Sequence, residues 1–407
     1  MILDKLFYFK TKSLDFHIKI LFLDLKIYLG SFISWIVAFL NPKNYFSLYN
    51  LLKTNSSQSI LIIELNNFHS EIFPSWLFYL KRLSYQNRIF FLGSAKLYNA
   101  KPFDLISKKE NNSYNFYKMD PKIILLYINL GLFKRYKKVI FNSDIFYSSS
   151  INNNYSQLSD FITKQDILKN VIFLSHLILQ TIGCKNKFIN PQKQIMTISP
   201  SISQDANIKY VAPIFNENHF NINKEEVENF NHKKTFISCG NIKINDKDSY
   251  GLMTALDETF AFDKKINIVG KAPKILTAKF LNHNQDIIHY NTRLSYLELK
   301  FILQKSHFIL FLLSNKVSYR YKFNSSSGSF PLALNFNLIP IIEEDFAKFY
   351  CLNETNAIIY KEGFLGDAIK YACQMKYEEY FKLQSSFLSL KIRLKEASLK
   401  NIEKILL

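Results

Sequence analysis

The stretch SSSGSFPLALNFNLIPII, residues 325–342, contains the local signals of a turn, a helix and a strand in succession. A serine-rich turn around Gly328 comes first, a short helix is predicted over 330–337, and an apolar strand follows over 338–343. Backbone N–H groups at a helix N-terminus attract anions, and the helix dipole adds to this attraction. We therefore predict that this turn binds a phosphate, and that Gly328 lets the backbone turn tightly and approach the ligand.

The same alternation of short apolar strands and helices extends in both directions along the chain. Strands are predicted in the first half at 60–65, 88–93, 137–143, 170–175, 194–199 and 208–215, and in the second half at 235–240, 266–270, 286–290, 308–313, 338–343 and 357–360. Helices are predicted between them, notably at 74–83, 120–136, 295–306 and 330–337. Such a pattern indicates parallel sheets that are covered on both faces, so the expected fold class is α/β.

A polar stretch rich in lysine and glutamate, residues 216–234, separates the two series of strands. We predict two doubly wound, Rossmann-like domains that face a central cleft, at 46–216 and 217–375. An N-terminal helical segment, 1–45, precedes them, and lysine-rich C-terminal helices, 376–407, follow. In such sheets ligands bind beyond the carboxyl ends of the strands, so functional residues are expected in the loops that follow them.

The N-terminal segment contains an apolar stretch at residues 18–40, whose uncharged part, 27–40, has 14 residues. A membrane-spanning helix needs roughly 20, so a span is the least favoured of three readings. The other two are a helix packed on the body of the protein and an amphipathic helix lying in a membrane interface with Trp35 and Phe39 inserted. No signal peptide is predicted, because no small-residue cleavage site follows a short apolar core.

Charge and cysteine content limit the expected partners. The chain of 407 residues has a formal net charge of +19, with 52 basic and 33 acidic residues, which suggests an anionic partner such as a phosphorylated ligand or an anionic membrane surface. An AT-rich genome would also produce an excess of lysine. The lysines are scattered and no nucleic-acid motif occurs, so nucleic acid is not an expected partner.

The four cysteines are spread along the chain without a CxxC pair, as in a cytoplasmic protein with reduced thiols.

The loop after the first predicted strand, ELNNFHSEIFP, contains His69 and Glu71. A histidine beside a carboxylate suits the work of a general base, so these two residues are the candidate catalytic pair. The alternative is structural: His69 would cap the following helix, and Glu71 would complement the helix dipole.

Candidate ligand-binding residues follow three strands of the second half. Gly240 ends one strand, and Lys243 and Lys247 follow it in a layout that could meet a diphosphate, or that could be a solvated lysine-rich loop. Arg320 precedes the serine-rich turn, where a cation, hydroxyls and backbone N–H groups converge. Glu343 ends another strand and could bind ribose or sugar hydroxyls, or could be a solvated strand end.

Several common catalytic motifs are missing from the sequence. It has no Ser-His-Asp signature, no GxGxxG, no Walker A sequence and no DxD metal motif. We therefore expect neither a metal nor another cofactor.

The second half resembles the donor-binding domain of GT-B fold glycosyltransferases, particularly bacterial enzymes that build capsule and lipooligosaccharide. The resemblance covers about residues 60–390. It lies in the order and spacing of FISCGNIKINDKDSYGLMTAL (236–256), INIVGKAP (266–273) and the run from 287 to 313, followed by the serine-glycine turn and its helix and strand. The opening of the first half, ELNNFHSEIFPSWLFYL, also fits an acceptor-side domain.

The resemblance implies roles for the candidate residues. Gly240 with Lys243 or Lys247 would face the donor diphosphate, the backbone from Tyr290 to Leu294 would flank the nucleobase, Ser327, Gly328 and Ser329 would hold phosphate or donor sugar, and His69 would act as base or orienting residue. Many retaining members carry a glutamate early in the helix after the glycine turn. Here that position falls on Ala333 or a neighbour, and 330–337 contains no acid. An inverting, base-assisted displacement is therefore favoured, with a positive cleft that stabilises the leaving group without a metal.

The sequence thus predicts an enzyme that moves a sugar from a nucleotide-sugar donor to a glycan or lipid-linked acceptor in bacterial surface polysaccharide synthesis. It would act in the cytoplasm, with peripheral contact to the anionic inner membrane face. Two alternatives remain on the same architecture. A nucleotide-sugar epimerase or hydrolase would need no acceptor, and a non-catalytic scaffold would bind no nucleotide.

Overall fold

The computed structural model describes residues 58–64, 72–85, 89–106, 114–120, 136–142, 171–175, 195–198, 208–217, 228, 230–242, 248–282, 286–292, 294–313 and 327–407. The predicted N-terminal helical segment, 1–45, lies outside these residues. Among the helices that are described, none combines the length and the apolar character needed to cross a membrane.

The first half of the chain forms a seven-stranded sheet in the order β3-β2-β1-β4-β5-β6-β7. Its strands are β1 (Ile60–Glu64), β2 (Ile89–Gly93), β3 (Tyr114–Lys118), β4 (Lys138–Phe141), β5 (Val171–Ser175), β6 (Ile195–Thr197) and β7 (Lys209–Tyr210). All neighbouring strands are parallel. The order reverses at β1, as the prediction of a doubly wound sheet requires.

One strand of this sheet, β3, was not predicted, because its sequence YNFYK lies in a polar stretch. β3 is an edge strand, and none of its residues is fully buried. It is stabilised by cross-strand aromatic contacts, since the Phe91 ring centroid lies 5.7 Å from that of Tyr114 and 6.3 Å from that of Phe116. Strands that are buried on one side only lack the continuous apolar run by which the other strands are recognised.

The second half forms a six-stranded sheet in the order β10-β9-β8-β11-β12-β13. Its strands are β8 (Lys234–Cys239), β9 (Lys264–Val269), β10 (Ile287–Tyr290), β11 (Phe308–Leu310), β12 (Ile339–Glu343) and β13 (Ile358–Tyr360). All are paired in parallel. Each strand predicted for this half is confirmed, with bounds that differ by a few residues. Most of their apolar side chains are buried, which explains why these strands could be recognised, although Ile288 of β10 is exposed.

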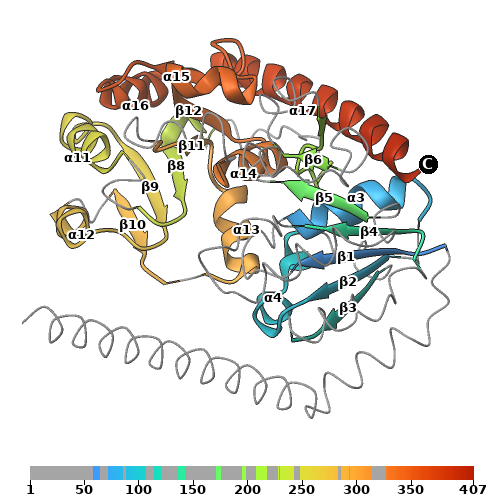
Figure 1. The fold of residues 1–407 in the computed structure, drawn as a ribbon. Coiled ribbons are helices and arrows are strands. Elements are labelled where there is room, and N and C mark those ends of the chain that lie inside the picture. The colour runs from blue at the N-terminus through green and yellow to red at the C-terminus, as the bar shows by residue number, and fades with distance from the viewer. Residues whose placement is uncertain are drawn as a thin grey trace, which may run out of the picture.

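Helices cover both faces of the second sheet (Figure 1). On one face lie α11 (Ser249–Glu258), α12 (Lys274–Asn282) and α16 (Leu365–Gln374); on the other lie α13 (Tyr296–Gln304), α14 (Ser329–Phe336) and the long α17 (Tyr377–Leu406). The remaining helical elements are α3 (Phe73–Arg82), α4 (Ala95–Ala100), η2 (Pro102–Leu105), α15 (Glu344–Ala347) and η9 (Lys348–Tyr350). The start of α13 is fixed by a capping box, in which Ser295 Oγ accepts from the Glu298 N–H and Glu298 Oε2 accepts from the Ser295 N–H.

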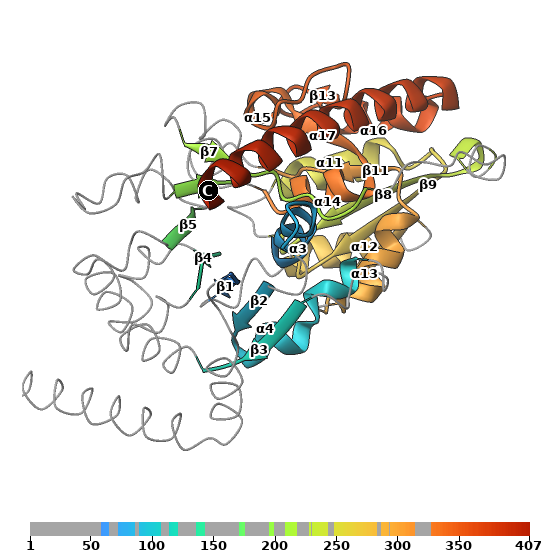
Figure 2. The same cartoon turned by 90° about the vertical axis from the view of Figure 1, so that its right-hand side faces the viewer.

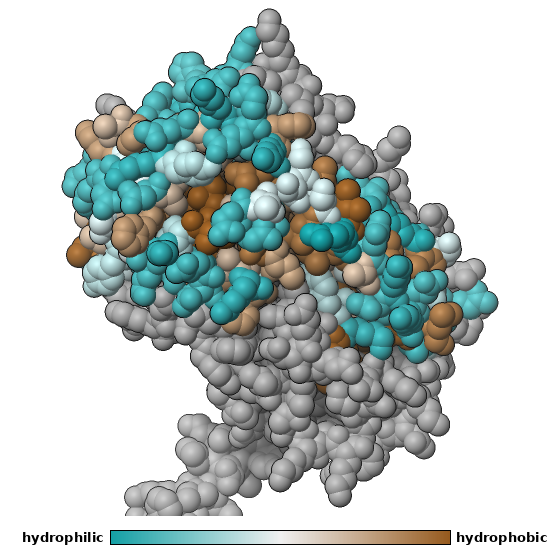
Figure 3. Space-filling view, turned by 90° about the horizontal axis from the view of Figure 1, so that it is seen from above, coloured by the Kyte–Doolittle hydropathy of each residue, from teal (hydrophilic) through white to brown (hydrophobic). Residues whose placement is uncertain are grey.

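The C-terminal helix α17 crosses from the second sheet to the first (Figures 1 and 2). Near its end, Ser398 Oγ accepts a hydrogen bond of 2.8 Å from the Ala212 N–H, and Asn401 Nδ2 donates to the Tyr210 carbonyl over 2.8 Å. Seen from above, the described surface is mostly hydrophilic, with hydrophobic residues near its middle and at scattered places around it (Figure 3). The helix therefore acts as a brace that joins the two halves.

Asn335 on α14 provides a second link between the halves. Its side chain is fully buried and makes hydrogen bonds in four directions. Oδ1 accepts from the N–H groups of Phe215 and Asn216 at 2.6 and 3.0 Å. Nδ2 donates to the carbonyl oxygens of Pro213 and Pro331, both at 2.7 Å. One amide thus anchors the segment that leaves the first sheet to a helix of the second.

Lys391 on α17 is a buried cation in this brace, only 3% exposed, and its Nζ has no hydrogen-bond partner within the described residues. Burial, together with the nearby Lys395, lowers its pKa to about 8 from an ordinary 10.5, while Glu217 opposes the shift. Between these two pH values the unfolded chain holds a proton that the native protein has released. Stability should therefore rise with pH across this window.

We expect Lys391→Met to stabilise the protein by about 3 kcal/mol at pH 7, and by only about 1 kcal/mol at pH 10, because the cost of burying the charge disappears as the wild-type lysine loses its proton. Urea unfolding at both pH values measures the difference. The exposed Lys382→Met on the same helix is the control and should change little at either pH. An equal effect of Lys391→Met at pH 7 and pH 10 would contradict this account.

Candidate functional site

At the carboxyl ends of β1 and β4, a buried polar network connects three side chains. Trp76 Nε1 donates to Asn142 Oδ1 over 2.9 Å, and Asn142 Nδ2 donates to Glu64 Oε2 over 3.0 Å. Glu64 and Asn142 are fully buried and Trp76 is nearly so. Glu64 and Asn142 were not among the predicted site residues. A polar residue at the end of a buried parallel strand is the sequence signal by which they could have been found. The network holds the ends of both strands where the first predicted ligand-binding loop begins.

At the carboxyl ends of β8 and β9, the backbones of Gly240 and Gly270 lie against each other. Both have positive φ angles, +95° and +131°. A Cβ on Gly270 would lie 2.7 Å from the carbonyl carbon and oxygen of Gly240, so only glycine allows this approach. By contrast, a Cβ on Gly240 would meet no described atom within 4 Å. The Cβ side of Gly240, which no described atom occupies, lies where the sequence predicted a ligand.

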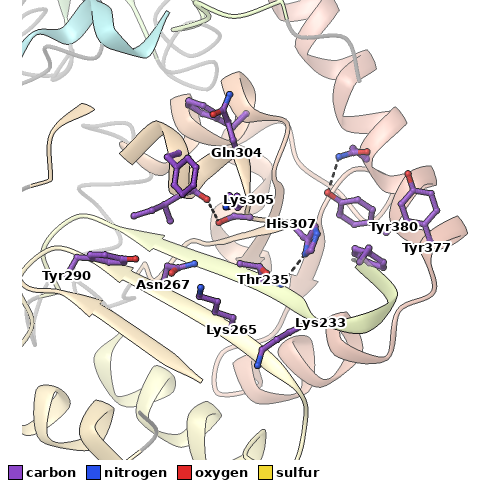
Figure 4. Close-up of a pocket in the computed structure, with 16 residues that line it drawn as sticks. Lys233, Thr235, Lys265, Asn267, Tyr290, Gln304, Lys305, His307, Tyr377 and Tyr380 are labelled. Atoms are coloured by element: carbon purple, nitrogen blue, oxygen red, sulfur yellow. Dashed lines mark hydrogen bonds between the residues drawn. The ribbon is translucent and has the colours of Figure 1, made fainter. Parts of the chain in front are cut away.

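Tyr290 and Leu294 flank the start of the connection from β10 to α13. The Tyr290 carbonyl accepts a 3.0 Å hydrogen bond from the Gly270 N–H, which places the Tyr290 backbone beside the two glycines. Its side chain instead lines a cavity on the α13 side of the sheet (Figure 4). Leu294 comes directly before Ser295, the N-cap of α13. The structure therefore brings together Gly240 and the backbone of Tyr290.

The serine-glycine turn does precede a helix, since α14 begins at Ser329. Three N–H groups in its described part, from residue 327 onward, are already bonded within the protein: Ser327 N–H donates to Tyr350 Oη at 2.9 Å, Ser329 N–H to Ser327 Oγ at 3.3 Å, and Phe330 N–H to the Ser327 carbonyl at 3.1 Å. Ser329 Oγ is buried without a hydrogen-bond partner among the described residues. In this conformation the turn offers an anion fewer donors than its sequence suggests.

Gly328 does not adopt the glycine-specific backbone conformation that the predicted tight turn implies. Its φ of −60° and ψ of −17° belong to the ordinary right-handed region, and a Cβ there would meet no described atom within 4 Å. The turn therefore does not require glycine for its backbone conformation. Gly240 and Gly270 are the glycines at strand ends that do require it.

All eight residues of α14 are buried. Ala333, where the resemblance placed a missing glutamate, is fully buried, and two residues further on Asn335 is occupied by its four hydrogen bonds. An acid at position 333 or 335 would therefore face the protein interior. The absence of a glutamate is therefore consistent with how the helix packs.

Glu343 ends β12, lies beside Tyr360 of β13 and is 4% exposed. It takes part in interactions within the protein, so it is not the solvated strand end that was the alternative. Burial raises the pKa of Tyr360 well above its usual value, and the carboxylates of Asp248 and Glu343 raise it further. Glu343 and Asp248 thus place two carboxylates near the buried Tyr360 hydroxyl, at the carboxyl ends of β12 and β13.

The other predicted site residues, His69, Glu71, Lys243, Lys247 and Arg320, lie outside the described residues. Within the described ranges, no three histidine, cysteine, aspartate or glutamate side chains are grouped closely enough to hold a metal ion. The described cysteines, Cys239, Cys351 and Cys373, form no disulfide.

Comparisons with known proteins support the fold. No family model matches the sequence, and no curated protein matches it. Among solved structures, the chain is similar to Anabaena Alr3699/HepE in complex with UDP and glucose, at a TM-score of 0.54 and 8% identity, over 86% of this chain and 99% of that one. HepE with UDP-glucose gives a TM-score of 0.53 at 7% identity, over 85% of this chain and 99% of that one.

The chain is less similar to WaaG, a glycosyltransferase involved in lipopolysaccharide biosynthesis, at a TM-score of 0.44 and 8% identity, over 83% of this chain and 95% of that one. The chain has the GT-B fold, with two doubly wound parallel sheets, as the sequence predicted.

Proposed function

We propose that this protein transfers a sugar from a nucleotide-sugar donor to a glycan or lipid-linked acceptor. The observation that carries the proposal is the likeness of 86% of the chain to a protein whose structures contain UDP with glucose, and UDP-glucose. The close approach of Gly240 and Gly270 at the carboxyl ends of β8 and β9 supports a donor site there, because ligands of doubly wound sheets bind beyond these ends.

In this proposal the donor lies against the second sheet. Gly240 with Lys243 or Lys247 faces the diphosphate, the backbone from Tyr290 to Leu294 flanks the nucleobase, and Arg320, Ser327, Gly328, Ser329 and Glu343 contact phosphate, ribose or sugar. The ammonium and guanidinium groups would stabilise the departing nucleotide diphosphate, so the reaction would need no metal. Because Ser327 and Ser329 use their N–H groups internally, their contribution to binding requires a rearrangement of the turn.

His69 acts in this proposal as the base that accepts the acceptor hydroxyl proton, with Glu71 orienting it. A positioned general base contributes about 10²- to 10⁴-fold to rate. Glu64 and Asn142 would hold the β1 end from which the His69 loop leaves. The net charge of +19 fits an enzyme of surface polysaccharide synthesis that works in the cytoplasm, beside an anionic inner membrane face.

The first experiment is a thermal-shift panel with UDP, GDP, CMP and their sugar conjugates, each with and without Mg²⁺. A ligand at 100 times its dissociation constant adds about 2.7 kcal/mol of stability. We expect one nucleotide class to raise the melting temperature without Mg²⁺. If no nucleotide does so on folded protein, the scaffold alternative replaces the proposal. Turnover of a sugar nucleotide without any acceptor would instead favour an epimerase or hydrolase.

The catalytic assignment is tested with His69→Ala. Transfer to acceptor should fall at least 100-fold while the nucleotide-induced thermal shift remains, because the base acts on the acceptor and not on the donor. The exposed His232→Ala serves as the matched control and should retain full activity. Normal transfer by His69→Ala would remove histidine from the catalytic role and leave the donor site intact.

A further inference from the structure

We propose that a cavity on the α13 side of the second sheet is a second ligand site, one that binds a phosphate monoester of a ring compound. The cavity measures about 650 Å³, within the usual range of small-molecule sites, and is lined by strands β8, β9 and β10 together with α13 and the start of α17 (Figure 4). It goes beyond the proposed sugar transfer and does not depend on it.

Strand register builds the floor of this cavity. Thr235 of β8 lies beside Lys265 of β9, and Asn267 of β9 lies beside Ile288 of β10. Because side chains alternate between the faces of a sheet, Thr235, Lys265 and Asn267 all point to the α13 side. The residues between them point to the opposite face, which α11 and α12 cover.

The charged lining of the cavity lies away from the predicted donor site. Thr235 and Lys265 are the second residues of their strands, and His307 comes directly before β11, so these residues lie at the amino ends, whereas the Tyr290 side chain reaches the cavity from the carboxyl end of β10. Gly240 lies at the other end of β8, about 16 Å away at the rise of an extended strand. A phosphate held between Lys265 and His307 would therefore not occupy the space over Gly240.

The lining is positive. It includes Lys233, Lys265 and Lys305 and no acidic residue. Lys233 pairs with Asp263 at 2.8 Å, but Lys265 and Lys305 form no ion pair within the described part of the chain. Two uncompensated ammonium groups beside a concave, partly enclosed surface favour an anion, and a phosphate monoester has three terminal oxygens with which to accept from both of them and from a third donor.

His307 supplies a fixed neutral donor. Its Nδ1 accepts a 3.0 Å hydrogen bond from the Thr235 N–H, and burial, reinforced by the charge of Lys234, lowers its pKa to about 4. A neutral ring whose Nδ1 accepts carries its proton on Nε2. The ring is held edge-on by Phe230 and Tyr380, at centroid distances of 5.0 and 5.8 Å. The Nε2–H has no partner among the described residues and can donate to a ligand oxygen.

Aromatic side chains form much of the remaining cavity wall, and they are the reason for proposing a ligand that contains a ring. Phe301 on α13 is 58% exposed, although it lines a cavity, and Lys305 Nζ lies 4.1 Å from its ring centroid. The Tyr290 side chain lies across the cavity from the His307 side (Figure 4). An exposed ring face beside an unpaired cation suits a compound that carries a ring and a phosphate together.

The test is isothermal titration of the full-length protein with phenyl phosphate, glucose 6-phosphate, inorganic phosphate and phenol, each in the presence of excess UDP to fill any donor site. We expect phenyl phosphate or glucose 6-phosphate to bind at least 10-fold more tightly than inorganic phosphate or phenol. Preference between the first two distinguishes an aromatic from a sugar ring. No binding of either ring phosphate at 10 mM would overturn the proposal.

Variants locate the binding. The double variant Lys265→Gln with Lys305→Gln should weaken binding of the ring phosphate at least 10-fold, whereas Lys265→Arg should preserve that binding. Phe301→Ser should weaken binding of the ring phosphate but not of inorganic phosphate. Lys400→Gln, an exposed lysine near the end of α17, is the matched control. Unchanged binding in the double variant, with melting curves that show it folded, would place the ligand elsewhere and refute the site. Because UDP binding is measured separately, failure here leaves the sugar-transfer proposal standing.

Discussion

Asn335→Ala is expected to destabilise the protein by about 4 kcal/mol. The substitution removes the partner of two N–H groups and two carbonyl oxygens, and each buried polar group left without a partner costs about 1–3 kcal/mol. Some of this cost is recovered when water enters the space, which is why we expect less than the full sum. Urea unfolding at pH 7 measures the change.

Two further variants separate the causes. Asn335→Asp keeps the acceptor for Phe215 and Asn216 but sets a carboxylate against the carbonyl oxygens of Pro213 and Pro331, so it should be at least as harmful as alanine at pH 7. Asn356→Ala is the control, because Asn356 is equally buried but bonds only within its own turn, and it should cost about 1 kcal/mol. Equal effects of Asn335→Ala and Asn356→Ala would show that the link between the halves adds no stability.

Gly270→Ala is expected to cost about 3 kcal/mol or more. Its φ of +131° is unfavourable for alanine, and such a conformation alone costs about 1–3 kcal/mol. In addition, the new methyl would lie 2.7 Å from the Gly240 carbonyl, so the ends of β8 and β9 must move apart. Chemical denaturation gives the loss of stability, and the nucleotide thermal shift should disappear in the same variant.

Gly363→Ala isolates the conformational part of this cost. Gly363 has a φ of +84°, and a Cβ there would meet no described atom within 4 Å, so alanine should cost only about 1 kcal/mol. A Cβ on Gly240 would also meet no described atom within 4 Å, so Gly240→Ala should cost little more stability than Gly363→Ala. Gly240→Ala should also weaken nucleotide binding if the donor lies there. If Gly270→Ala and Gly363→Ala are equally destabilising, the close contact of the two glycines is not what requires glycine.

Most strands could be predicted from the sequence because each of them carries a local pattern of apolar residues. Strands such as β1 and β12 are continuous apolar runs, and a run of that kind must be buried on both faces. The edge strand β3 escaped because half of its surface faces away from the core. Around the candidate site, the structure confirms that Gly240 lies at the end of a strand and that a helix follows Ser327, but the sequence contains no signal for the contacts of Glu64, Asn142 and Gly270, which depend on neighbouring strands.

The sequence by itself thus determined the alternation of strands and helices, the division into two series, and the turn that opens α14. These features depend on residues a few positions apart, whose periodicity and conformational preferences are written in the chain. Only the tertiary structure decided what the polar groups do. Asn335 bonds to residues about 120 positions away, and Ser398 to one 186 positions away. The serine turn uses its own N–H groups, and the lysines around the cavity gather from separate strands and helices. Which partner a buried donor or cation finds depends on how distant segments pack, and no local pattern encodes that.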